Sequence, residues 1–287
     1  MKLQEYDCCA LCPRDCFVNR KIGEKGFCKQ DASLNIAWAG LHFGEEPPIT
    51  RKGGSGTIFV SGCNLGCSFC QNYQISHEGM GTAVSTSLFS CICLRLEKAG
   101  AENINIVTGS HHTVAIARGL EEARKNGMKI PILWNTSAYE KIKEVQRLSN
   151  YVDIWLPDLK TLDSRFSLEI FRASDYPKIA TDAILKMAEC APLKYENGSC
   201  REMREGERLV SGVIVRYLLL PNCLTDAENL IKWFSNNLKE KALLSIMTQY
   251  TPIERDEKKI DSGLDRYVAE KEDEMLKELL YKYDVED

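Results

Sequence analysis

Residues 56–70, with the sequence GTIFVSGCNLGCSFC, join a short apolar run to three cysteines in a C-x3-C-x2-C spacing. The run at 56–62 is rich in Thr, Ile, Phe and Val, which favour β-strands. Cys63, Cys67 and Cys70 follow it directly, so one loop can wrap an iron–sulfur cluster with thiolate sulfurs as iron ligands. Three thiolates leave one iron of a [4Fe-4S] cluster open to another ligand. The stretch therefore predicts a strand that leads into a cluster-binding loop.

Further apolar runs alternate with longer stretches of helical periodicity along the chain. Strands that are apolar along most of their length and separated by helices predict a parallel sheet with a covered outer face. We expect an α/β fold, an incomplete (β/α)6 TIM-like barrel with its ligands at the carboxyl ends of the strands. The expected strands are 56–62, 103–109, 131–137, 152–160, 212–221 and 243–252, and the expected helices are 86–100, 113–126, 138–149, 166–191 and 225–239.

The regions outside the barrel differ from it in composition. We expect three parts: a cysteine-rich N-terminal segment at 1–54, the barrel at 55–253, and a charged tail at 254–287. The tail carries apolar residues at helical spacing, which predicts one amphipathic terminal helix. Within the barrel, the stretch 188–212 is rich in Gly, Ser and Glu and predicts a surface loop or lid.

Two helix starts carry the signature of a capping box, in which each side chain satisfies a backbone N–H. The first pairs Ser137 with Glu140, and the second pairs Thr225 with Glu228. Both are expected to begin helices of the barrel.

The overall composition excludes several classes of protein. The 37 basic and 41 acidic residues nearly balance, and no basic stripe interleaved with aromatics predicts a nucleic-acid partner. No apolar run approaches the ~18 residues of a membrane span, so no membrane partner is expected. The start MKLQEYDCCALCPRDC lacks the apolar segment of a secretory signal, so we expect a cytoplasmic, reducing location. The 13 cysteines then indicate metal binding or catalysis rather than disulfides.

The cysteine spacing, Phe69 before the last cysteine and the position after the first strand resemble the radical SAM superfamily. Most of the chain is similar to proteins related to pyruvate formate-lyase activating enzyme. The resemblance implies that S-adenosylmethionine chelates the open iron. An electron from the reduced cluster would then cleave S-adenosylmethionine to methionine and a 5'-deoxyadenosyl radical. This radical would abstract hydrogen from a substrate. It also implies a reductant such as flavodoxin or ferredoxin. A zinc site at the triad is the alternative, although His77 is the one nearby residue that could supply a fourth ligand.

The resemblance assigns S-adenosylmethionine-binding roles to residues at the ends of the second and third strands. Thr108, Gly109 and Ser110 occupy the place of a GGE-type loop for the methionine amino group, without its acidic residue. An ordinary βα turn is the alternative interpretation of this stretch. Asn135 and Thr136 match an Asp-Thr pair that lies by the nucleotide and helps to hold a cation. Here Asn135 replaces the Asp of that pair.

Charged residues on the fourth and fifth strands complete the set. Asp158 and Lys160 match an Asp-x-Lys pair beside the nucleotide, and residues two apart on a strand share a face. Arg216 stands where the family's arginine contacts the methionine carboxylate, and its fork suits a carboxylate. A surface ion pair for the first two and a structural salt bridge for Arg216 are the alternatives. Gln249 and Tyr250 on the sixth strand depart from the family, which has a His near the adenine.

The N-terminal segment carries a second group of cysteines. Cys9, Cys12, Cys16 and Cys28, with Cys8 adjacent, are spaced so that four thiolates can close around one zinc ion or one iron–sulfur cluster. A similar CxLCPRxC segment occurs in a subgroup of radical SAM proteins. A metal-free segment held by packing is the alternative.

The residues described above are compatible with three classes of function. The resemblance favours an enzyme that abstracts hydrogen from a protein, possible targets being a glycyl-radical enzyme or another protein substrate. A radical SAM enzyme that modifies a small molecule or another protein site would share the same cleavage residues. A non-catalytic iron–sulfur or zinc protein is the third class, and it has no reason to retain Asp158, Lys160 and Arg216.

Overall fold

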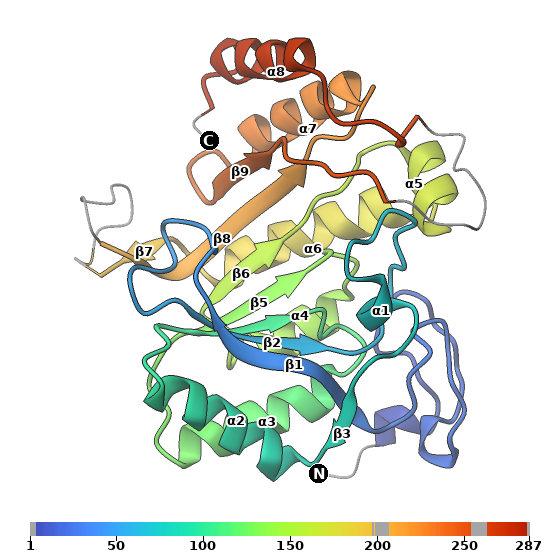
Figure 1. Cartoon of the computed structure of the whole chain (residues 1–287), viewed down its shortest axis with the longest axis vertical. Helices are drawn as coiled ribbons and strands as arrows, with labels where there is room; N and C mark the ends of the chain where they lie inside the picture. The colour runs from blue at the N-terminus through green and yellow to red at the C-terminus, as the bar shows by residue number, and fades with distance from the viewer. Residues whose placement is uncertain (1–3, 197, 199–206, 254–262, 286–287) are drawn as a thin grey trace.

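The computed structural model describes residues 4–196, 198, 207–253 and 263–285. Its centre is a sheet in which the strands β2-β4-β5-β6-β8-β9 lie in that order, each parallel to its neighbours (Figure 1). This confirms the expected parallel sheet and its incomplete barrel. The strands are β2 (Ser55–Val60), β4 (Ile104–Val107), β5 (Ile132–Thr136), β6 (Ile154–Pro157), β8 (Leu209–Leu218) and β9 (Leu243–Met247).

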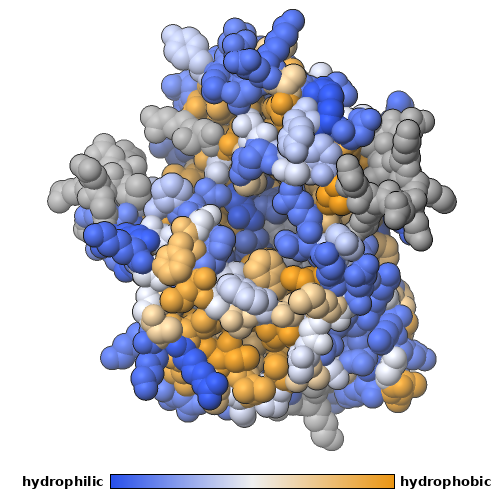
Figure 2. Space-filling view, viewed as in Figure 1, coloured by the Kyte–Doolittle hydropathy of each residue, from blue (hydrophilic) through white to orange (hydrophobic). Residues whose placement is uncertain are grey.

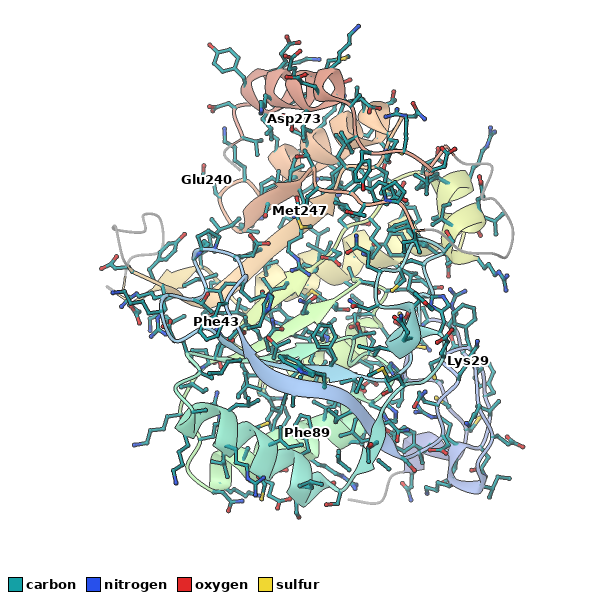
Figure 3. The ribbon with its side chains drawn as sticks, in the orientation of Figure 1. Lys29, Phe43, Phe89, Glu240, Met247 and Asp273 are labelled. Atoms are coloured by element: carbon teal, nitrogen blue, oxygen red, sulfur yellow. The ribbon has the colours of Figure 1, made fainter. Side chains whose placement is uncertain are left out.

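Helices follow these strands and pack on the outer face of the sheet (Figure 1). Phe89 on α2 points from its helix toward the sheet (Figure 3), and a Cβ at Gly119 on α3 would lie 2.4 Å from its ring. The small residue therefore lets the two helices approach closely. The helices are α2 (Thr86–Lys98), α3 (Thr113–Lys125), α4 (Ile142–Leu148), α5 (Ser164–Phe171), α6 (Tyr176–Cys190) and α7 (Leu224–Asn237), besides the short α1 (Tyr73–Ser76) after β2.

The single helix expected over 166–191 is wrong, because two helices occupy this stretch. Arg172 ends α5 in the left-handed conformation at φ 55°. Pro177 then lies in the first turn of α6, where a missing backbone N–H is tolerated. The chain therefore turns between the two helices.

The two expected capping boxes are also wrong. The residue that precedes α4 is Lys141, four residues after Ser137, and the residue that precedes α7 is Cys223, so Thr225 lies inside the helix. At the first of these sites Glu140 is drawn away from the backbone, because its carboxylate binds buried side-chain donors instead.

Alternate residues of each strand face opposite sides of the sheet, as the period of a strand requires. Outward side chains such as Ile106, Trp134 and Val215 belong to the main core beneath the helices. Inward side chains near the start of the strands form a second core with Ile49, which comes from the connection between β1 and β2. Toward the carboxyl ends the inward residues are only partly buried. This accessible group comprises Phe59, Val107, Asn135, Asp158, Arg216, Leu218 and Met247.

Three short or edge strands that the sequence does not announce extend the sheet. β1 (Leu34–His42) pairs antiparallel with β2, and β3 (Thr82–Val84) pairs antiparallel with β1. β7 (Lys194–Tyr195) pairs antiparallel with β8. β1 thus joins part of the segment 1–54 to the barrel's sheet. The stretch 188–212, predicted as a surface loop or lid, instead begins in the last turn of α6 and ends in β8, and residues 197 and 199–206 within it lie outside the described residues.

The N-terminal segment begins with two 3-10 turns, η1 (Gln4–Tyr6) and η2 (Arg20–Ile22), and lies beside β3 and α1 (Figure 1). A small core of Tyr6, Cys9 and Leu11 packs on Val114 of α3. The segment is therefore anchored to the barrel by buried apolar contacts.

The charged tail forms a shorter helix than expected. α8 (Glu270–Lys282) packs beside α7 with Leu276 buried, whereas part of the predicted range, 254–262, lies outside the described residues (Figure 1). In the parts of the chain that are described, no helix is long and apolar enough to cross a membrane.

Candidate active site

The cysteine loop begins where β2 ends. Gly62 and Gly66 adopt positive φ angles of 81° and 70°, which allow the chain to turn tightly on either side of Cys63. The sulfur of Cys63 accepts a hydrogen bond from the backbone N–H of Leu65 at 3.3 Å. Such donors stabilise the thiolate form that iron requires. The loop thus places the Cys63 sulfur where a backbone N–H can stabilise its thiolate form.

The other two sulfurs of the triad lie on the same turn. The backbone N–H of Cys70 donates to the carbonyl of Cys67 at 3.2 Å, and the hydroxyl of Ser76 donates to the Cys70 sulfur at 3.2 Å. Burial raises the pKa of Cys63 and of Cys67, and the nearby charge of Lys160 opposes this effect at both. These thiols are therefore neutral until iron binding releases their protons.

The geometry of the triad differs from that of a mononuclear site. Among the residues that the structure describes, no three His, Cys, Asp or Glu side chains are placed to hold a single metal ion. Sulfurs bound to one zinc lie at most about 4.6 Å apart, twice the Zn–S distance. Ligands of an iron–sulfur cubane bind different irons and lie farther apart. The zinc alternative for the triad thus finds no support in the described residues.

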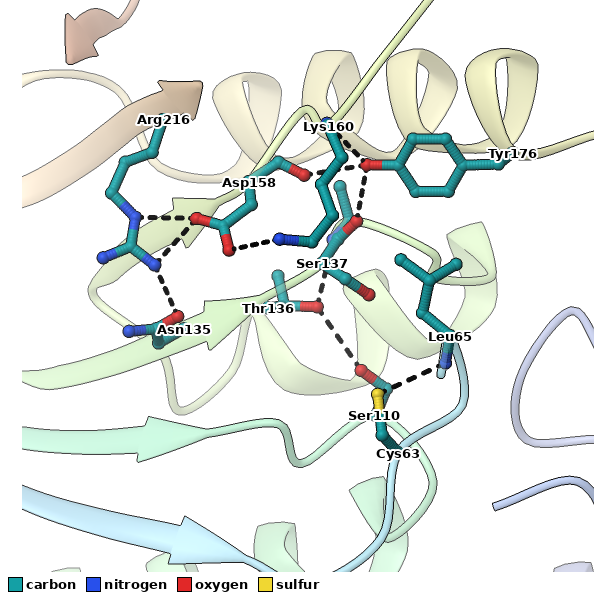
Figure 4. A network of polar contacts seen from close by, with 11 residues as sticks. Cys63, Leu65, Ser110, Asn135, Thr136, Ser137, Asp158, Lys160, Tyr176 and Arg216 are labelled. Carbon is teal, nitrogen blue, oxygen red and sulfur yellow. Dashed lines mark hydrogen bonds and ion pairs between the residues drawn. The ribbon is translucent and has the colours of Figure 1, made fainter. Parts of the chain in front are cut away.

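A partly buried ion-pair network joins the charged residues predicted on β6 and β8 (Figure 4). Nε of Arg216 donates to Oδ1 of Asp158 at 2.8 Å, and Nζ of Lys160 donates to Oδ2 of the same carboxylate at 3.1 Å. Nη2 of Arg216 donates to the side-chain carbonyl of Asn135 at 2.7 Å. Four of the predicted site residues are thereby brought together at the carboxyl ends of neighbouring strands.

Electrostatics keep this network charged. Burial by itself raises the pKa of Asp158, but the charges of Arg216 and Lys160 outweigh it and hold the pKa below its usual value. Burial lowers the pKa of Lys160, whereas Asp158 and the Cys67 sulfur raise it, with a net shift upward. Lys160 is therefore a cation that interacts with both the carboxylate and the cysteine loop.

The backbone beneath the network is fixed by one tyrosine (Figure 4). The hydroxyl of Tyr176 accepts from the backbone N–H of Lys160 at 2.9 Å and lies 3.0 Å and 2.9 Å from the carbonyls of Ser137 and Asp158. It comes from the start of α6 and ties the ends of β5 and β6 together. The backbone that carries the network is thus fixed by hydrogen bonds between α6 and the ends of β5 and β6.

Other predicted residues lie nearby with buried side chains. The hydroxyls of Ser110 and Thr136 donate to Oε1 of Glu140 at 2.6 Å and 2.7 Å. Gly109 packs against Trp134, because a Cβ there would lie 2.4 Å from that ring. Thr108, at φ 61°, donates its backbone N–H to the carbonyl of Asn135. These residues shape the turn after β4, and their roles toward S-adenosylmethionine stay predictions.

Phe69 also lies within the packed structure around the cysteine loop. Its ring contacts Phe171 and Tyr250 with centroid separations of 6.1 Å in each case. The aromatic residue before the last cysteine therefore helps to fix the loop against α5 and the segment after β9.

Two acidic residues that the sequence analysis did not single out approach the network from a loop. Glu45 lies near Arg216, and burial raises the pKa of its carboxyl while the Arg216 charge opposes that shift. Glu46 accepts a hydrogen bond from Ser245 of β9 at 3.0 Å. Both belong to the connection between β1 and β2, which crosses the inner face of the sheet. In the sequence, the adjacent pair Glu45 and Glu46 in the connection between two apolar strands was the feature that could have indicated these positions.

Arg14 of the N-terminal segment contacts the cysteine loop directly. Its guanidinium donates to the carbonyls of Asn64 and Leu65 at 2.9 Å and 3.0 Å, and to those of Phe171 and Arg172 at 2.7 Å and 2.6 Å. Three part-buried hydrogen bonds and one exposed hydrogen bond are thereby made by one side chain. The arginine within CPRDC is thus a structural link between the segment and the triad.

The fold and the site define a partial parallel barrel with a three-cysteine loop after its first parallel strand and a charged network at the carboxyl ends of its strands. Residues 50–176 match a family model described as a 4Fe-4S single cluster domain. The uncharacterized protein MJ0674 of Methanocaldococcus jannaschii is 27% identical over 292 residues, which cover 97% of this chain and 75% of that protein.

Solved structures share the fold at low sequence identity. SuiB of Streptococcus suis bound to S-adenosylmethionine matches with a TM-score of 0.52 and 15% identity over 80% of this chain and 45% of SuiB. Methylornithine synthase PylB matches with a TM-score of 0.52 and 10% identity over 79% of this chain and 62% of PylB. The chain thus spans about half the length of the solved structures that it matches. These solved structures show the fold, and the matched cluster domain includes the three-cysteine loop.

Proposed function

We propose that this chain reductively cleaves S-adenosylmethionine at a [4Fe-4S] cluster held by Cys63, Cys67 and Cys70. The observation that carries the proposal is the position of Lys160, whose charge acts on Cys67 while its Nζ pairs with Asp158. The cysteine loop and the charged network therefore belong to one site. When bound, the cluster would supply an electron and an open iron for the amino and carboxylate groups of the methionine part.

The residues of the network would bind and orient this co-substrate. Arg216 uses Nε and Nη2 for Asp158 and Asn135, and no described residue accepts from its Nη1 group, which would then donate to the carboxylate of the co-substrate. Asp158 would hold the guanidinium in place, since its pKa is lowered and it stays ionised. The inner core around Ile49 closes the floor beneath the network and would exclude water from that side.

The substrate of hydrogen abstraction would be a peptide or protein, with a glycyl-radical enzyme as the specific candidate. Figure 2 shows apolar surface gathered on the part of this face where Figure 1 places β1. Trp38 of β1 is 44% exposed and Phe43 is 67% exposed, and the Trp38 ring lies 6.0 Å from that of Phe59 at the rim of the accessible inner face. SuiB, which shares the fold, has been solved bound to its precursor peptide SuiA.

The reaction can be tested without a known substrate. Protein reconstituted anaerobically with iron and sulfide would be reduced with dithionite, given S-adenosylmethionine, and assayed for 5'-deoxyadenosine. The wild type should form it, and the Cys63→Ala, Cys67→Ala, Cys70→Ala triple variant should not. Cys91→Ala, on the exposed side of α2, is the matched control for loss of a thiol and should behave as wild type. Equal product from the triple variant would refute the assignment.

A wild type that assembles the cluster but forms no product needs a second measurement. Equilibrium titration of the same protein with S-adenosylmethionine would then decide the matter. Binding without cleavage indicates that the protein substrate triggers the reaction, whereas absence of binding overturns the proposed function.

A further inference from the structure

We propose that Cys9, Cys12, Cys16 and Cys28 bind a second iron–sulfur cluster, with buried Arg20 as its charge-compensating neighbour. Three of these side chains are at most 8% exposed, and Cys16 is half-buried. The backbone N–H of Phe17 donates to the Cys9 carbonyl at 2.9 Å, and that of Phe27 donates to the Cys16 sulfur at 3.3 Å, so the turns that carry the cysteines lie side by side. This inference goes beyond the proposed function, because the cleavage reaction uses the other cysteine loop.

The sulfurs are surrounded by backbone donors. The Cys12 sulfur accepts from the N–H of Arg14, and the Cys28 sulfur accepts from the N–H of Gln30. The Cys16 sulfur accepts from the N–H of Phe27 at 3.3 Å. In the first two, the donor follows its cysteine by two residues, the same relation that joins Leu65 to Cys63 in the triad. Backbone N–H groups directed at cysteine sulfur stabilise thiolates and tune clusters.

One glycine beside the sulfurs has no space for a side chain. A Cβ at Gly26 would lie 2.7 Å from the Cys16 sulfur, which is shorter than a van der Waals contact between carbon and sulfur. The backbone therefore passes directly over this cysteine, and the position requires glycine.

Arg20 is the observation that points to a ligand. Its side chain is 1% exposed, and among the described residues no carboxylate lies within ion-pair distance of it. It donates to the carbonyls of Asp31 at 3.0 Å and His111 at 2.5 Å, and Nη1 lies 3.8 Å from the Cys9 sulfur. A buried guanidinium without an anion costs several kcal/mol. Cluster thiolates would supply the missing negative charge.

The two histidines beside Arg20 cannot supply that charge. His112 accepts from Nη2 of Arg20 through Nε2 at 3.0 Å and faces the hydroxyl of Tyr6 through Nδ1 at 3.0 Å. Burial lowers the pKa of both His111 and His112, so both rings are neutral. The cysteine sulfurs are then the groups near Arg20 that can carry negative charge when a metal binds.

A cluster fits the arrangement better than a single ion. Neither this group nor the triad places three ligands in mononuclear geometry within the described residues. The triad is the site for which the 4Fe-4S domain match provides independent support. The N-terminal group, like the triad, shows no single-ion arrangement among the described residues, so a cluster is the cofactor that we propose for it.

The test uses the whole chain of 287 residues, in a variant in which the first cluster cannot form. The Cys63→Ala, Cys67→Ala, Cys70→Ala variant would be reconstituted anaerobically and analysed for iron, sulfide and zinc. We expect about four iron ions per chain and a matching amount of sulfide. Adding Cys12→Ser and Cys28→Ser should abolish this iron, whereas adding Cys91→Ala should not.

Three outcomes would overturn the proposal: no iron and sulfide in the triple variant, zinc in their place, or iron that persists after the Cys12 and Cys28 substitutions. Circular dichroism of each variant checks that the chain is folded. Because the readout is metal content of a variant without the radical-chemistry cysteines, its failure is distinct from failure of the proposed function.

The role of Arg20 has its own readout. A positive charge favours the more reduced, more negative state of a cluster. In the same triple variant, Arg20→Met should therefore lower the midpoint potential of the remaining cluster in an EPR-monitored titration, and Arg20→Lys should lie closer to the parent. An unchanged potential in Arg20→Met would refute charge compensation.

Discussion

Arg216 of β8 lies with Nε 2.8 Å from Oδ1 of Asp158, across the bridge that pairs the end of β6 with β8. The side chain of Arg216 is 12% exposed and that of Asp158 is 23% exposed, so the pair faces the accessible inner side of the sheet. The sequence alternatives of a structural salt bridge and a ligand-binding arginine are both compatible with this geometry, and they predict different behaviour on substitution.

Arg216→Met should weaken S-adenosylmethionine binding at least tenfold, about 1.4 kcal/mol, because the donor to its carboxylate is lost. Affinity would be measured by equilibrium titration of reconstituted protein. Arg216→Met combined with Asp158→Asn should not recover affinity, and it should lower stability further because Lys160 then loses its carboxylate partner. Arg124→Met, which breaks a surface pair with Asp153, is the control. Unchanged affinity in the first variant would assign Arg216 a structural role.

Arg14→Gln should loosen the cysteine loop, since four carbonyls lose a shared cationic donor. We expect the free energy of unfolding to fall by about 1–3 kcal/mol, because buried carbonyls lose their hydrogen-bond donor. We also expect the EPR line shape of the triad cluster to change. Arg165→Gln on the exposed side of α5 provides a matched charge control. A destabilised variant with an unchanged spectrum would separate Arg14 from the cluster.

Glu140→Gln and Glu140→Ala should differ strongly in stability. Oε1 of Glu140 accepts from Ser110, Thr136 and Nε1 of Trp134, and the side-chain carbonyl of Gln can replace it. Alanine would leave three buried donors unpartnered, at about 1–3 kcal/mol for each such group. Urea denaturation measures the difference. Equal stability of the two variants would mean that these hydrogen bonds do not support the fold.

His111 makes the fold sensitive to acid. Burial lowers its pKa to about 3, with the Arg20 charge acting in the same direction, whereas a histidine in the unfolded chain titrates near pH ~6.5. The contribution of neutral His111 to the free energy of unfolding is therefore fully present above pH ~6.5. It is lost as the pH falls toward the folded-state pKa of His111, by up to ~1.4 kcal/mol per pH unit.

His111→Gln should flatten this dependence, because Gln has no proton to bind and its amide can still donate to the carbonyl of Ser61, which His111 Nε2 contacts at 2.7 Å. Unfolding free energies of both proteins at several pH values between 7 and 4 would test it. The same slope in variant and wild type would contradict the assignment.

The sequence predicts those parts of the fold whose signal is local. Each parallel strand is a run of apolar and β-branched residues followed by helical periodicity. β1 carries LNIAWAGLH, in which Ala and Gly weaken that signal, and its pairing with β2 depends on a tertiary contact. The division between α5 and α6 likewise depends on Arg172 adopting a left-handed conformation, which nothing in its immediate sequence announces.

The same distinction holds for the site. Asp158, Lys160 and Arg216 could be predicted because a charge within an apolar strand needs a partner. Glu45 could not be placed, because the path of its loop across the inner face is set by Ile49 packing on distant strands. Glu140 resembled a helix cap, and only the buried hydroxyls of Ser110 and Thr136 explain its actual direction.

The contacts of the N-terminal segment constrain the order of events during synthesis. Arg20 binds His111 and His112, and Arg14 binds the carbonyls of Phe171 and Arg172. At ribosomal rates of about 5–20 residues per second, these partners emerge many seconds after the first cysteines. The nascent chain therefore exposes its N-terminal thiols before it can bury them. If these thiols hold the proposed second cluster, iron delivery would either follow the completion of α5 or protect them while translation is still under way.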